Sequence, residues 1–123
     1  MTSAILDVVS AGMSDAGRHR ERNEDSFLTA RPVFLVADGL GGHARGEAAS
    51  SAVVEAFTEI AGRDWLTSEQ LLEIIGTASA RVRALDSGAG APGSTVSGVA
   101  LTHHGGVPCW LVFNIGDSRT YLL

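Results

Sequence analysis

The chain has 123 residues, 45% hydrophobic and 19% charged, a balance typical of a folded domain, or part of one, rather than of a disordered chain. Its net charge of −5 and its lack of lysine disfavour a nucleic-acid partner, because phosphate backbones are bound by basic surfaces. The single cysteine, Cys109, excludes an intrachain disulfide, and we interpret it as a small core residue. We see neither a secretion signal nor an apolar run long enough to cross a membrane, so we expect a cytoplasmic protein with no membrane partner.

Three apolar segments in the first third of the chain predict β-strands. Residues 5–13 predict a first strand. Residues 26–29 and 33–37 predict a pair of strands joined at Arg31 and Pro32, because proline fixes its own φ and biases the residue before it away from helix. This pair is expected to form a hairpin, which would bring the acids beside the two strands toward one point.

Two helices are predicted in the middle of the chain. Residues 46–60 carry apolar side chains at helical spacing, with small residues that would allow close packing against a sheet. Thr67 and Gln70 have the spacing of a capping box, which predicts the start of a second helix. One face of that helix would carry Leu71, Ile75, Ala78, Val82 and Leu85.

The last third of the chain again predicts strands. Residues 107–115 alternate with period two, and residues 94–102 are expected to pair with them through a turn at 103–106. A further strand is predicted at 119–123. Because helices and strands segregate, we predict an α+β domain with antiparallel sheets. An apolar strand at 119–123 would leave an open sheet edge, so we interpret residues 1–123 as the N-terminal part of a single domain.

The acidic residues beside the predicted hairpin suggest a metal site. Asp38 ends an apolar strand and is followed at once by a glycine-rich turn, while Glu24 and Asp25 lie just ahead of the other strand. Hard divalent cations prefer carboxylate and carbonyl oxygens, and glycines let the backbone fold its carbonyls toward an ion. In the alternative, purely structural interpretation, Asp38 only caps the turn that follows it.

The same turn also satisfies a dinucleotide-binding pattern, through Gly39, Gly41 and Ala44. The pattern requires a second parallel strand after the helix, whereas here a second helix is predicted. Asp38 would also repel a pyrophosphate. We therefore reject a nucleotide site.

Four segments in this order resemble the metal-dependent serine/threonine protein phosphatases, the PPM or type 2C family, in their bacterial form. The resemblance implies an antiparallel β-sandwich flanked by helices, with two Mn²⁺ or Mg²⁺ ions, and a third in some members, that activate a water for attack on phosphoserine or phosphothreonine. The substrates would be phosphorylated proteins, and a serine/threonine kinase or its targets would be partners. The segments are SDAGRHRERNEDS (14–26), DGLGGHARGEAA (38–49), GST (93–95) and IGDSRTY (115–121).

The resemblance also implies roles for individual residues. Asp38 matches the ligand that bridges both metals, while Glu24 and the Gly39 carbonyl would bind one of them. Asp25 resembles the acid that orients water at the metals.

Two further positions match the family pattern outside this acidic group. Arg20 matches the phosphate-binding arginine, whose planar fork of donors suits a tetrahedral dianion. Asp117 matches an aspartate that helps hold the third metal. The nearby His43 could be offered as a substitute general acid, an interpretation that we do not favour.

The chain departs from the family pattern after Asp117. The family places further metal-binding aspartates later in its sequence, whereas the six residues after Asp117 contain no acid. Leu40 occupies the position where many eukaryotic members carry a histidine. These departures leave two hypotheses open: a metal-dependent phosphatase, or a truncated, non-catalytic binding or regulatory module.

Overall fold

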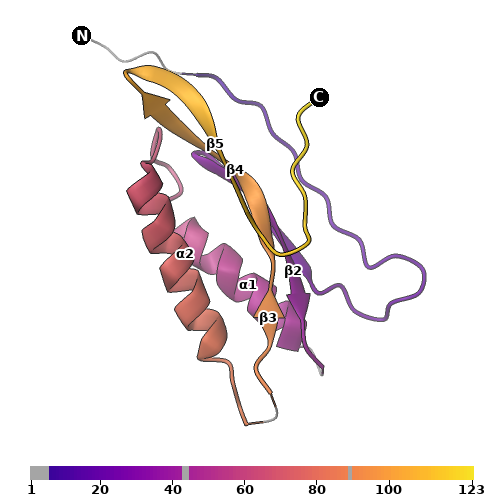
Figure 1. Ribbon diagram of the computed structural model, residues 1–123. Coiled ribbons are helices and arrows are strands. Elements are labelled where there is room, and N and C mark those ends of the chain that lie inside the picture. Colours follow the sequence, from indigo (N-terminus) through magenta and orange to yellow (C-terminus); the bar gives the residue numbers. More distant parts are fainter. Residues whose placement is uncertain (1–5, 43–44, 89) are drawn as a thin grey trace.

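The computed structural model describes residues 6–42, 45–88 and 90–123 (Figure 1). Two helices cover one face of a five-stranded antiparallel sheet, whose strand order is β1-β2-β4-β5 with the short strand β3 paired to β2. This architecture confirms the predicted α+β class with antiparallel pairing. The elements are β1 (Asp25–Ala30), β2 (Val33–Leu40), α1 (Arg45–Thr58), α2 (Ser68–Arg83), β3 (Gly93–Ser94), β4 (Val96–His104) and β5 (Val107–Ile115).

The hydrophobic core lies between the sheet and helix α1. Strand β2 alternates buried and exposed side chains, so that every second residue points toward the helices. Phe57 of α1 is fully buried and stacks on Phe113 of β5, with ring centroids 5.7 Å apart. Burial of a large apolar side chain contributes about 1.5–3 kcal/mol, so this layer dominates the folding energy. The buried core includes Val33, Leu35, Ala37, Val53, Ala56, Phe57, Leu66, Leu71, Val96 and Ala100.

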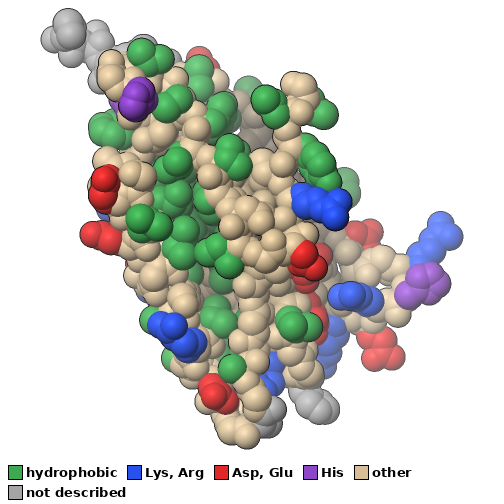
Figure 2. Space-filling model, viewed as in Figure 1, with side chains coloured by type: hydrophobic (Ala, Val, Ile, Leu, Met, Phe, Trp, Pro, Cys, Tyr) green, Lys and Arg blue, Asp and Glu red, His purple; other side chains and the backbone are tan. Residues whose placement is uncertain are grey.

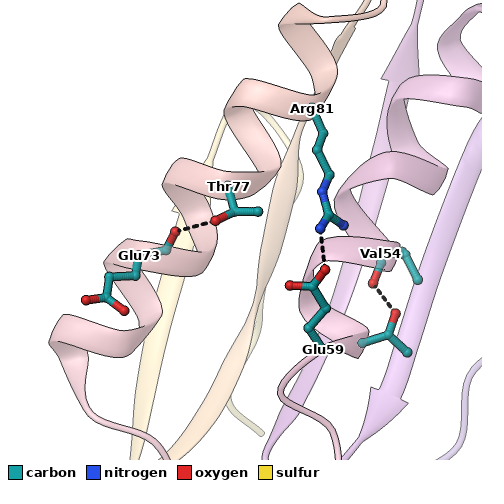
Figure 3. Close-up of polar contacts among 6 residues, drawn as sticks. Val54, Glu59, Glu73, Thr77 and Arg81 are labelled. Atoms are coloured by element: carbon teal, nitrogen blue, oxygen red, sulfur yellow. Dashed lines mark hydrogen bonds and ion pairs between the residues drawn. The ribbon is translucent and has the colours of Figure 1, made fainter.

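Helix α2 begins where the sequence predicts it. The Thr67 side chain accepts a hydrogen bond from the Gln70 backbone N–H at 3.1 Å, and the Gln70 side chain accepts one from the Thr67 backbone at 2.8 Å. Arg81 of α2 forms an ion pair with Glu59, just beyond α1, and so links the two helices (Figure 3). Within the described residues, no helix is long and apolar enough to cross a membrane.

Apolar side chains gather between α2 and the sheet, as Figure 2 shows. They line a pocket of about 260 Å³ that α1, α2, β4 and β5 form together. At the edge of the sheet, β5 runs for nine residues without a charged side chain. The residues that line the 260 Å³ pocket include Val53, Phe57, Ile75, Ala78, Val82, Val96 and Ile115.

The face of the sheet opposite the helices, called here the open face, is only partly covered. Val36, Trp110 and Val112 are exposed on it, and Trp110 packs edge-to-face on Phe34 at 6.0 Å. Residues 6–14 and 117–123 run as extended chain over part of this face (Figure 1).

Two predicted strands are wrong. Residues 6–13 and 119–123 are not in strands. Gly12 lies against the Phe27 ring, and Thr120 reaches Ser97 by a side-chain hydrogen bond of 2.8 Å, so both segments lie on top of the sheet instead of beside an edge. Backbone groups that lie above a sheet face cannot join its ladder.

The predicted hairpin at the end of the chain needs a smaller correction. Strands β4 and β5 pair as expected, but the turn is only Gly105 and Gly106, because His103 and His104 belong to β4 and pair with β5. Ser94 does not belong to β4, because it lies in β3 and pairs with Gly39 of β2. Strand β2 also continues past Asp38 to Leu40.

Candidate metal and phosphate site

The register of β1 and β2 places Asp25 directly opposite Asp38. Strand alternation directs both side chains to the open face, and both residues are exposed. Directly opposed residues on antiparallel strands have Cβ atoms about 4.5–5.5 Å apart, close enough for their carboxylates to meet. The hairpin therefore brings the two acids together, as the sequence predicts.

The electrostatics of this pair favour a cation. The pKa of Asp25 is raised by desolvation, by its side-chain hydrogen bond to Asp38 and by the negative charge of that neighbour; Glu24 raises it further. The nearby Arg20 guanidinium lowers it, which places a positive charge close to the acids. Like charges held at close range destabilise the ionised form, and a divalent cation relieves that cost.

Glu24 and Gly39 are held together by the backbone. The Gly39 N–H donates to the Glu24 carbonyl at 3.0 Å, and the buried Ser50 hydroxyl of α1 donates to the same carbonyl at 2.7 Å. The Ser26 and Ser50 hydroxyls are 2.9 Å apart. Glu24, the residue just before β1, is thus fixed to both β2 and α1.

Two glycines allow the first turn of α1 to approach this point. A Cβ on Gly39 would lie 1.7 Å from the Gly46 carbonyl oxygen, so only glycine fits there. A Cβ on Gly46 would lie 2.8 Å from the Glu24 carboxylate and 3.0 Å from the Gly39 carbonyl carbon. The Glu24 carboxylate and the Gly39 carbonyl group therefore converge at the start of α1.

A pocket of about 350 Å³ opens beside the acid pair. It is shaped by β1, β2, the segment before β1 and the turn after β5. Asp117 lies exposed in that turn, while its neighbour Ser118 lines the pocket. The lining residues are Met13, Ser14, Asp15, Asp25, Ser26, Phe27, Val36, Ala37, Asp38, Ser118 and Arg119.

Arg20 lies in the loop that projects ahead of β1, at the right of Figure 1, where charged side chains stand away from the body (Figure 2). It is exposed, and its charge reaches Asp25. His43 lies outside the described residues.

The donor chemistry fits hard divalent cations, since carboxylates and a carbonyl are the groups that Mg²⁺ and Mn²⁺ prefer. Across the residues that the structure describes, no group of three or more His, Cys, Asp or Glu side chains is arranged to hold a metal ion. The site thus supplies a pair of facing acids, with Glu24 and the Gly39 carbonyl beside them.

Sequence reasoning assigned no role to Gly46, Ser50 or Thr95. Gly46 and Thr95 belong to the sequence motifs, but why a glycine and a threonine are needed there depends on which backbone atoms approach them in the folded chain. Ser50 carried no signal beyond being one small residue among several in α1.

The protein phosphatase 2C family model matches residues 15–122. The chain belongs to the protein phosphatase 2C family. This confirms the resemblance carried by the four sequence motifs. The match spans both acidic segments, the Gly93–Ser94 strand with Thr95, and the turn that contains Asp117.

The curated relatives that the chain matches are bacterial serine/threonine protein phosphatases. The chain is 37% identical over 130 aligned positions to the serine/threonine protein phosphatase PstP of Mycobacterium tuberculosis, covering 100% of this chain and 24% of that protein. The chain therefore spans about a quarter of the length of this curated relative.

Solved structures of the protein phosphatase 2C family show the same fold. The PPM Ser-Thr phosphatase MsPP from Mycobacterium smegmatis, in complex with cacodylate, aligns with a TM-score of 0.75 and 33% identity, over 92% of this chain and 48% of that one. The catalytic domain of PstP in complex with two manganese ions aligns with a TM-score of 0.69 and 28% identity, over 87% of this chain and 47% of that one. The chain thus spans about half the length of these structures.

Proposed function

We propose that this chain carries part of the catalytic site of a protein serine/threonine phosphatase, which hydrolyses phosphoserine and phosphothreonine in proteins. The observation that carries the proposal is the Asp25–Asp38 pair, held face to face by strand register beside Glu24 and Gly39. The serine/threonine phosphatases to which the chain is similar support the reaction class.

The metal ligands in this proposal are Glu24, Asp38 and the Gly39 carbonyl, with Asp25 orienting water and Asp117 contributing to a third ion. Asp38 would be shared between two Mn²⁺ or Mg²⁺ ions. When bound, such cations activate a water as nucleophile and neutralise charge on the phosphoryl oxygens. The manganese ions of the PstP catalytic domain support this assignment.

Arg20 is proposed to bind the phosphoryl group. Its guanidinium offers several N–H donors in a plane, which match the oxygens of a phosphate ester. Its influence on the Asp25 pKa supports a position within reach of the acids. The loop that carries it projects into solvent, as a segment that meets a protein substrate must (Figure 1).

The partners in this proposal are phosphorylated proteins, and a serine/threonine kinase would act on the same substrates in the opposite direction. We propose a cytoplasmic location. We also propose that residues 1–123 are the N-terminal part of one catalytic domain.

The deciding experiment measures hydrolysis of p-nitrophenyl phosphate and of a phosphothreonine peptide, with and without Mn²⁺. The matched control is Asp38→Asn, which keeps the shape of the side chain and removes its charge. Mn²⁺-dependent turnover that is lost in the control supports the proposal. Turnover that is equal in both proteins, or independent of metal, contradicts it.

A second candidate is a non-catalytic binding or regulatory module. It is favoured by the lack, among the described residues, of a group of three side chains able to hold a metal. Binding and hydrolysis of a phosphothreonine peptide together distinguish the phosphatase from the non-catalytic module. A module would bind a phosphothreonine peptide, and lose that binding in Arg20→Ala, without hydrolysing the peptide at any Mn²⁺ concentration.

A further inference from the structure

The ladder of hydrogen bonds around Asp38 contains an irregularity. Strand β2 pairs with β4 only as far as Val36, opposite Ser97, and pairs with β3 again from Gly39, opposite Ser94. Thr95 falls between β3 and β4 and belongs to neither strand. Asp38 therefore lies opposite a break in the neighbouring chain.

Thr95 fills that break with its side chain. The Asp38 backbone N–H donates to the Thr95 hydroxyl at 3.0 Å, and the Thr95 backbone N–H donates to the Asp38 carbonyl at 2.9 Å. A side-chain oxygen thus replaces the carbonyl that a continuous strand would offer. Both polar backbone groups of Asp38 are held by this one residue, which limits the freedom of the carboxylate attached to them.

The same threonine contacts the turn that contains Asp117. Its hydroxyl is hydrogen-bonded to the Ser118 hydroxyl. Its methyl group packs on Gly116, where a Cβ would lie 2.7 Å from it and where φ is +98°, so the turn closes onto Thr95 only with glycine. Two segments that lie far apart in sequence therefore share Thr95 as their point of contact.

We propose that Thr95 is a positioning residue, which holds Asp38 opposite Asp25 and fixes the Asp117 turn relative to Asp38. This proposal rests on the proposed function, since the position of Asp38 matters for catalysis only if Asp38 binds metal. Residues that orient ligands are worth about ten- to hundredfold in metal affinity, although they never touch the metal.

The test uses Thr95→Val, which keeps the methyl group and the backbone N–H but loses the hydroxyl. We expect Mn²⁺ affinity, measured by calorimetry, to fall about tenfold. The Asp38→Asn variant measures the Mn²⁺ binding that remains when the proposed ligand has lost its charge. We expect the Asp38 amide to exchange its hydrogen about three- to tenfold faster, because it loses its acceptor. Thr95→Ser, which keeps the hydroxyl, should restore both quantities.

A matched control separates positioning from general loosening. Ser97 of β4 is buried and also forms a hydroxyl–hydroxyl bond to the C-terminal segment, through Thr120 at 2.8 Å, but it does not bond to Asp38. Ser97→Ala should lower the melting temperature while Mn²⁺ affinity stays at the wild-type value. If Ser97→Ala lowers Mn²⁺ affinity as much as Thr95→Val does, the positioning role is refuted.

The amide measurement requires neither metal nor turnover, so it remains decisive if the proposed phosphatase function fails. Unchanged Asp38 exchange in Thr95→Val overturns the proposal. If Thr95→Val does not fold, Ser118→Ala decides instead. It should change the amide signal of Thr95, which is 23 residues away in sequence, while the Asp38 amide stays protected, and an unchanged Thr95 signal would refute the link.

Discussion

Helices α1 and α2 bury one face of the sheet, whereas the open face presents Asp25 and Asp38 to solvent. The same strands build both faces, because successive side chains of a strand point in opposite directions. Ala37 is buried under α1, and the next residue, Asp38, is exposed. The difference shows that the helix side supplies the folding energy and the open side carries charges that reduce it.

The largest effect that we expect from a substitution on the open face is a loss of catalytic turnover. Asp38→Asn should lower Mn²⁺-dependent turnover by several factors of ten, each equal to about 1.4 kcal/mol of barrier, because the proposed shared ligand loses its charge. The measurement is kcat/KM for p-nitrophenyl phosphate in the protein that carries the site. Turnover close to that of the wild type would contradict the role given to Asp38.

The helix side should respond in the opposite way. Phe57→Ala removes a fully buried ring that stacks on Phe113, and it should cost about 3–5 kcal/mol of unfolding free energy. Urea denaturation measures the loss. Because Phe57 is not in contact with the acid pair, any variant molecules that remain folded should keep their Mn²⁺ affinity, and a separate loss of affinity would erase the distinction between the two faces.

Gly46 connects the two faces, so its substitution sharpens the comparison. In Gly46→Ala the new methyl group meets the Glu24 carboxylate at 2.8 Å, and we expect Mn²⁺ affinity to fall about tenfold as that side chain moves aside. The matched control is Gly76→Ala in α2, where nothing lies within 4 Å of the new Cβ. That control should gain about 0.5–1 kcal/mol of stability, since alanine favours helix, without affecting the metal. Equal Mn²⁺ affinity in the two variants would argue against Glu24 as a ligand.

The smallest effect should be a gain in stability. The raised pKa of Asp25 means that the folded, metal-free chain binds a proton more readily than the unfolded chain does. The stability of the folded chain therefore falls as the pH rises from the pKa of Asp25 in the unfolded chain through its pKa in the folded chain. Asp25→Asn removes that cost and should stabilise the metal-free chain at neutral pH by less than about 1 kcal/mol, because solvent screens exposed charges. Melting in EDTA at pH 7 and at pH 3 measures it. The gain should vanish at the lower pH, and a loss of stability at pH 7 would contradict this electrostatic account.

Local patterns predicted the hairpin and the helices because their information is local. The apolar run at 33–37 and the capping box at Thr67 and Gln70 each specify structure within a few residues. The hairpin was also enough to predict that Asp25 and Asp38 meet, since a short turn fixes the register.

Features that depend on distant backbone could not be predicted. Residues 119–123 have strand-like composition, but composition does not say whether a neighbouring strand edge is available to pair with. The role of Thr95 depends on a break in pairing 57 residues away from Asp38 in sequence. The need for glycine at position 39 follows from the approach of α1, which only the folded chain defines.

The uncharged strand β5 has a consequence for the handling of residues 1–123 on their own. Natural edge strands usually carry a lysine, a charged inward-pointing side chain or a bulge that discourages a second sheet from adding to them. Strand β5 has only Pro108 near its start for this purpose, and exposed Trp110 and Val112 lie beyond it. If residues 1–123 are prepared on their own, β5 is therefore the segment at which two copies would pair edge to edge, and one added charge at Val112 is the substitution to raise solubility.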